Sequence, residues 1–96
     1  MPLEWKDHLT DQLCDALLTL KTSEEAYCFL EDVATIAEIK ALAQRLQVAF
    51  MLMDGASYPQ IAERTGASTA TISRVKKTVD YGADGYQIIR SRISKE

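Results

Sequence analysis

Residues 57–79 constrain the fold of this chain more than any other stretch, because they predict two short helices joined by a tight turn. Ser57 can cap the first helix, and Gln60, three residues later, completes a capping box. Gly66 is the residue type best suited to the left-handed turn that ends such a helix. The spacing therefore predicts a helix-turn-helix.

The second of these two helices has two distinct faces. Ser68 can cap it, and we expect it to span about residues 69–78. At about 100° per residue, Ile72, Val75 and Val79 point toward a core. The opposite face is small and uncharged near its N-terminus and basic further along: Ala70, Ser73, Arg74 and Lys77. This is typical of a recognition helix, whose first turns contact base edges while later residues bind phosphate.

Two functions are compatible with this pattern. The first is sequence-specific binding of double-stranded DNA. The residues that we expect to contact DNA are Arg64, Ser68, Thr69, Ala70, Thr71, Ser73, Arg74, Lys76 and Lys77. The second is a non-catalytic helical adaptor, which would use the same helix-turn-helix, with its solvated basic face, to contact another protein. The small-then-basic outer face favours DNA, whereas the acidic N-terminal half would suit a basic partner protein.

Charge is distributed unevenly along the chain. The net charge is −3, which by itself disfavours nucleic acid. However, residues 1–38 carry nine acids and two bases, while residues 39–96 carry five acids and nine bases. A local basic face matters more for DNA binding than the total charge. The acidic half would discourage indiscriminate DNA binding.

The remaining sequence predicts an all-α helix bundle in one domain, residues 1–96. We expect helices over 3–20, from 22 to about 32, over 36–53 and within 81–93. Capping boxes are predicted at Thr22 with Glu25 and at Thr35 with Glu38. We assign 1–54 to dimerisation helices, 57–79 to the helix-turn-helix and 81–96 to a short C-terminal helix.

The helix over 36–53 is apolar almost all the way round. Its main stripe is Ile39, Leu42, Leu46, Ala49 and Met53. A helix of this kind must be buried on several sides, and a chain of 96 residues has limited surface with which to bury it. It lies either at the centre of the fold or in a subunit interface, and we expect a homodimer.

The sequence gives little support for metal binding, catalysis or membrane association. His8, Cys14 and Cys28 lack metal-ligand spacing, and there is no glycine loop to hold a phosphate. We expect the cysteines to be reduced core thiols. No apolar run approaches a membrane span, and the N-terminus lacks a signal-peptide layout. We therefore expect a cytoplasmic protein that is not an enzyme, binds no metal and contacts no membrane.

The segment from Gly66 to Arg74 resembles the Trp repressor family, and in particular its small Trp-repressor-like members of the YerC/YecD type. The resemblance extends back through Thr35, Glu38, Ala41-Leu42 and Arg45 to Gly55. It implies an all-helical, intertwined homodimer that acts as a transcriptional regulator, expected to repress, on a palindromic operator. It also implies that the residues around Thr69 to Arg74 contact DNA.

The resemblance also implies a ligand pocket. In the Trp repressor, two arginines flank bound tryptophan, and the matching residues here are Arg45 and Arg74, with Thr35 at the edge. Val75 stands where the repressor has a glycine, and its branched side chain would fill space that the indole needs. We therefore expect no cofactor and no tryptophan binding. A different small co-ligand, or an Arg45 that is merely solvated or ion-paired, remain the alternatives.

Overall fold

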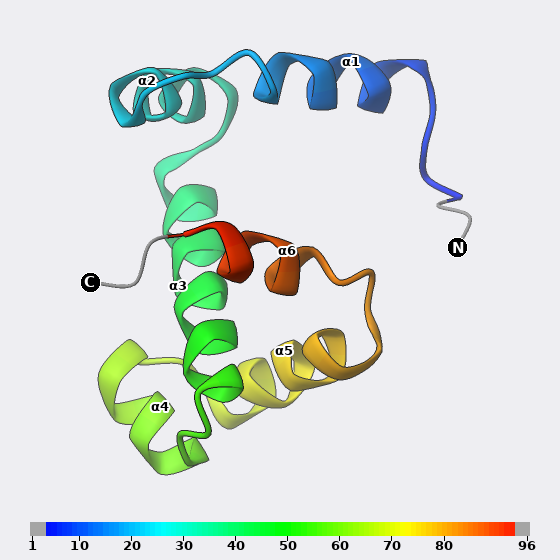
Figure 1. Cartoon of the computed structure of the whole chain (residues 1–96). Helices are drawn as coiled ribbons and strands as arrows, with labels where there is room; N and C mark the ends of the chain where they lie inside the picture. Colours follow the sequence, from blue (N-terminus) through cyan, green and yellow to red (C-terminus); the bar gives the residue numbers. More distant parts are fainter. Residues whose placement is uncertain (1–3, 94–96) are drawn as a thin grey trace. The chain divides into compact units, whose positions relative to one another are not determined.

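A computed structural model of the chain describes residues 4–93, and this part of the chain contains helices and no strand, which confirms the all-α prediction. The helices are α1 (His8–Leu17), α2 (Ser23–Val33), α3 (Ile36–Met53), α4 (Tyr58–Thr65), α5 (Thr69–Tyr81) and α6 (Gly85–Arg92) (Figure 1). The chain divides between Ile39 and Lys40 into two compact units. The first holds α1, α2 and the start of α3, and the second holds the rest.

Helix α1 is shorter than the predicted 3–20, because its N-cap is Asp7. The Asp7 carboxylate accepts a hydrogen bond from the backbone N–H of Thr10 at 2.9 Å, and the Thr10 hydroxyl accepts one from the Asp7 N–H at 2.8 Å. This capping box fixes the start of the helix at His8 and leaves Trp5 outside it. The hydrogen bonds from the backbone and hydroxyl of Thr10 lower the pKa of Asp7.

The capping boxes predicted at the starts of α2 and α3 differ in outcome. Thr22 caps α2 as predicted, with its hydroxyl accepting from the Glu25 N–H at 3.1 Å. The Glu25 carboxylate, however, accepts from the N–H of Lys21 at 2.9 Å, so the reciprocal half of the box is absent. At α3 the predicted box is complete, because Thr35 and Glu38 exchange both bonds, at 2.8 and 3.1 Å. The bounds of α3 are those predicted.

The first unit has no core of its own. No residue of α1 or α2 is buried. Eight large apolar side chains of this unit are more than two-fifths exposed: Trp5, Leu9, Leu13, Leu17, Leu18, Tyr27, Val33 and Ile36. Cys14 and Cys28 are free thiols, but both are exposed, so our expectation that they lie in a core was wrong for the single chain.

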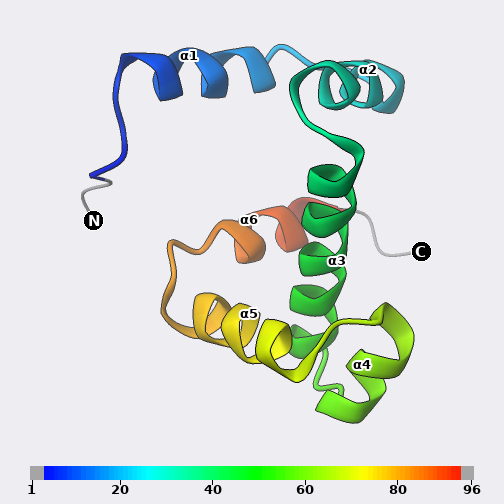
Figure 2. The same ribbon diagram turned by 180° about the vertical axis from the view of Figure 1, so that it is seen from behind.

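The second unit is built around a small core at the C-terminal end of α3. Its buried members come from α3, α4, the turn and α5: Val48, Ala49, Ile61, Ala67, Ile72 and Val75. The side-chain amide of Gln44 on α3 also donates to the carbonyl of Thr65 at 3.0 Å, which ties the end of α4 to α3. Figure 2 shows α4 and α5 gathered at this end of α3.

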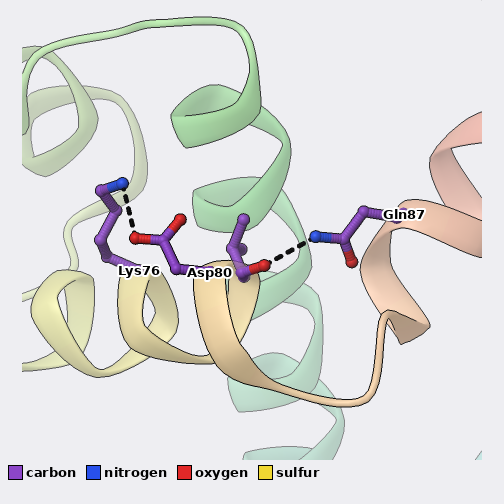
Figure 3. Close-up of polar contacts among 4 residues, drawn as sticks. Lys76, Asp80 and Gln87 are labelled. Atoms are coloured by element: carbon purple, nitrogen blue, oxygen red, sulfur yellow. Dashed lines mark hydrogen bonds and ion pairs between the residues drawn. The ribbon is translucent and has the colours of Figure 1, made fainter.

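Helix α6 returns to the same core from the far end of α5. The Arg90 guanidinium binds the Asp54 carboxylate at 2.8 Å and lies 4.7 Å from the centre of the Phe50 ring. The Gln87 amide donates to the carbonyl of Val79 at 2.7 Å (Figure 3). These contacts hold α6 against both α3 and α5.

Burial along α3 is uneven. Val48 and Ala49 are fully buried, whereas Leu42 is 51% and Ile36 63% exposed. The prediction that this helix is buried on several sides therefore holds only for its C-terminal half within one chain. Between residues 4 and 93, none of the helices is both long enough and apolar enough to cross a membrane.

Candidate nucleic-acid interface

Helix α4 begins and ends as the sequence predicts. The Ser57 hydroxyl accepts from the Gln60 N–H at 3.3 Å, and the Gln60 side chain accepts from the Ser57 N–H at 2.9 Å, which confirms the capping box. Gly66 has φ 74°, and its N–H donates to the Ala62 carbonyl at 2.8 Å. Glycine adopts this left-handed conformation without the strain that a Cβ introduces, so Gly66 sets the turn into α5.

Helix α5 is fixed in orientation by its cap and its buried face. The Ser68 hydroxyl accepts from the Thr71 N–H at 3.1 Å. Ile72 and Val75 are 0% and 3% exposed, and Val79 packs against the same core. The helix continues to Tyr81, beyond the predicted Thr78. It ends at Gly82, whose N–H donates to the Thr78 carbonyl and where a Cβ would collide with that oxygen.

The opposite face of α5 is open to solvent. Seven of the predicted contact residues on the turn and α5 are exposed: Ser68, Thr69, Ala70, Ser73, Arg74, Lys76 and Lys77. Arg64 on α4 is exposed as well and lines a surface hollow with Glu63, Gln60, Met51 and Ala56. Thr71 differs, because it is half-buried and its hydroxyl is 3.1 Å from the Ser68 hydroxyl. It therefore contributes to the cap of the helix.

One side chain near this face was not foreseen from the sequence. Asp80 forms an ion pair with Lys76, with the Lys76 Nζ 2.8 Å from the carboxylate (Figure 3). The hydrogen bond and the charge of Asp80 raise the pKa of Lys76. The spacing of four residues between a base and an acid on one helix was the signal that could have identified the pair.

The three residues expected at a ligand pocket are distributed over both units. Arg45 on α3 and Arg74 on α5 belong to the second unit, and both are exposed. Thr35 belongs to the first unit, where its hydroxyl caps α3. Val75, which departs from the repressor's glycine, is a core residue. Within residues 4–93, no group of three or more His, Cys, Asp or Glu side chains could hold a metal ion.

Comparison with known proteins gives one consistent result. The sequence model of the Trp repressor protein family matches residues 8–94. The uncharacterized protein YerC of Bacillus subtilis is 52% identical over 85 residues, which is 88% of this chain and 82% of that protein. A TrpR-like protein from Eubacterium eligens has a crystal structure that is similar with a TM-score of 0.88 at 48% identity, over 96% of this chain and 98% of that one. A candidate Trp repressor from Staphylococcus aureus has a TM-score of 0.88 at 45% identity, over 97% and 95% of the two chains.

Proposed function

This chain belongs to the Trp repressor family, and from that premise we propose that it is a sequence-specific regulator that binds double-stranded DNA as a homodimer through α4 and α5. The family is one of DNA-binding regulators and not of enzymes. We propose further that it represses and that its operator is palindromic, since a two-fold symmetric protein presents two equal recognition helices.

The proposal rests on the residues exposed on the outer face of α5. Ala70 and Ser73 are small and exposed near the start of the helix, so the backbone can approach a base pair closely. Arg74 and Lys77 follow on the same face with the reach to bind guanine or phosphate. Ile72 and Val75 hold the opposite side of the helix in the core, so this face is presented in one orientation.

Homodimerisation is supported by the apolar surface that one chain leaves uncovered. No residue of α1 or α2 is buried, and Leu42 on α3 is 51% exposed. Short helices gain most of their stability from packing an apolar face, so these helices need a partner surface. A second copy supplies a matching surface of the same kind.

The test of DNA binding is selection of bound sequences from random duplex DNA with the full chain. A recovered motif with two-fold symmetry supports both the proposed activity and the proposed symmetry. Recovery of no enriched motif, together with isolation of a stable complex with another protein in the absence of DNA, contradicts the proposal and favours the adaptor.

For the co-ligand we propose that tryptophan does not bind. The 3% exposure of Val75 supports this, because its side chain occupies core space where the repressor has a glycine. A thermal-shift screen over amino acids and their precursors tests it, since any ligand of the folded state raises the melting temperature. A clear shift with tryptophan contradicts the proposal, and a shift with another small anion identifies Arg45 and Arg74 as residues to change next.

A further inference from the structure

Asp80 is poorly placed for the stability of α5. It lies in the last turn of the helix, where a negative charge is next to the negative end of the helix dipole. Its partner Lys76 precedes it by four residues, and this order of base and acid is the less favourable one. The pair is also exposed, with side-chain exposures of 48% and 36%. Exposed pairs of this kind contribute little to stability, so stability does not explain the acid.

Asp80 is, however, well placed to act on the DNA-contacting face. It follows Ser73 by seven residues, which on a helix brings it within about 20° of the same direction and about 10 Å further along the axis. It also lies one turn beyond Lys77, on the same side. Asp80 therefore lies beside the lysines of this face, where its carboxylate can pair with one of them.

The ion pair occupies the Lys76 ammonium. Its Nζ is 2.8 Å from the Asp80 carboxylate, as the dashed line in Figure 3 shows. The carboxylate offsets the positive charge of the ammonium and holds it beside Asp80, so the ammonium attracts a phosphate less strongly. The paired lysine therefore contributes less to DNA binding than Lys77, for which no ion pair is seen within residues 4–93.

We propose that Asp80 lowers the sequence-independent affinity of this protein for DNA by holding Lys76 away from phosphate. The inference rests on the proposed function. Its consequence is that the protein dissociates more readily from DNA of any sequence.

The experiment compares Asp80→Asn with the wild-type protein on the selected operator and on an unrelated duplex of the same length, over a range of salt concentrations. Release of Lys76 in both subunits should add about two phosphate contacts, which steepens the slope of log K against log salt by about two units. We expect affinity for both duplexes to rise by a similar factor, on the order of tenfold at moderate salt. The melting temperature should stay the same or rise.

Two further variants isolate the cause. Asp84→Asn makes the same change of charge on an exposed residue just before α6, for which no ion pair is seen within residues 4–93, and should leave the slope unchanged. In the double variant Lys76→Ala with Asp80→Asn, the gain should disappear. A gain that persists without Lys76 overturns the proposal, and so does wild-type affinity in Asp80→Asn. If neither protein binds any duplex, the proposed function itself fails and this inference with it.

Discussion

Ala70 gives the most direct test of the recognition helix, because it is exposed on the outer face and distant from the core side of α5. Ala70→Glu should abolish specific DNA binding, with a loss of at least about 100-fold, since a carboxylate placed against phosphates costs several kcal/mol. Ile72 and Val75 remain packed, so the protein should stay folded. An electrophoretic shift on the selected operator measures the loss, beside circular dichroism and sizing of the same preparation.

The structure also decides which control suits this test. Ala67 lies in the turn, but it is only 5% exposed and belongs to the core, so a polar change there would disturb folding. Ser91→Glu is a better control, because Ser91 is exposed on α6, which holds none of the residues expected to contact DNA. If Ala70→Glu remains folded and binds as tightly as Ser91→Glu, then α5 does not contact the operator.

The two neighbouring lysines should differ in their salt dependence. Lys77→Ala removes an exposed base from the outer face of each subunit of the proposed dimer, so the slope of log K against log salt should become shallower by about two units. Lys76→Ala should change the slope less, because Asp80 already binds its ammonium. Titrations of one operator at four salt concentrations measure both slopes. Equal changes of this slope for Lys76→Ala and Lys77→Ala would contradict the expectation that the two lysines contribute differently.

At the scale of the element, two glycines of the second unit should respond in opposite directions to the same substitution. Gly66 has φ 74°, so Gly66→Ala should lower the free energy of unfolding by about 1–2 kcal/mol. Gly85 is the first residue of α6, has no positive φ and has open space where a Cβ would lie. Gly85→Ala should therefore raise the free energy of unfolding by about 0.5–1 kcal/mol. Chemical denaturation of the two variants checks both signs.

The elements that the sequence predicted best are those defined by local chemistry. Ser57, Gln60 and Gly66 fix α4 through contacts within a few residues, and both the cap and the turn were correct. The predicted start of α1 was wrong, because apolar residues recur every four positions from Trp5 to Leu17, whereas the capping box of Asp7 and Thr10 begins the helix after Trp5. The Arg90–Asp54 pair, 36 residues apart, carried no local signal.

The same distinction between what local sequence predicts and what it does not applies to the candidate site. Which face of α5 is exposed followed from periodicity alone, since Ile72 and Val75 fix the buried side. The role of Thr71 in the cap and the pairing of Lys76 depend on side-chain geometry that periodicity does not describe. Residue types alone do not establish a ligand pocket, because Arg45 and Arg74 are equally suited to solvent and both are exposed.

At the scale of the whole molecule, the proposed dimer predicts an unusual response at Leu42. This side chain is 51% exposed in one chain, and in a monomer Leu42→Lys should change stability by no more than about 0.5 kcal/mol. In a dimer whose interface covers it, a buried unpaired charge should cost several kcal/mol and separate the subunits. Light scattering distinguishes these outcomes against a chain mass of 10.7 kDa.

The wild-type protein should give about twice that mass at micromolar concentration, with an interface larger than the ~1,200–2,000 Å² of standard complexes. Its melting temperature should rise with protein concentration, because association stabilises the folded state. A compact monomer with an unchanged melting temperature over a hundredfold dilution would contradict the dimer, and so would a Leu42→Lys variant that behaves as wild type.

The lack of buried residues in α1 and α2 also bears on how long a subunit survives after synthesis. In the proposed dimer these helices are covered, whereas an unpaired chain presents them to proteases, which cleave segments that open easily. The rate of dimerisation depends on the square of the concentration of unpaired chains. Halving the rate of synthesis therefore lowers the amount of surviving dimer by more than half. Degradation of unpaired chains thus makes the amount of regulator respond steeply to its own production.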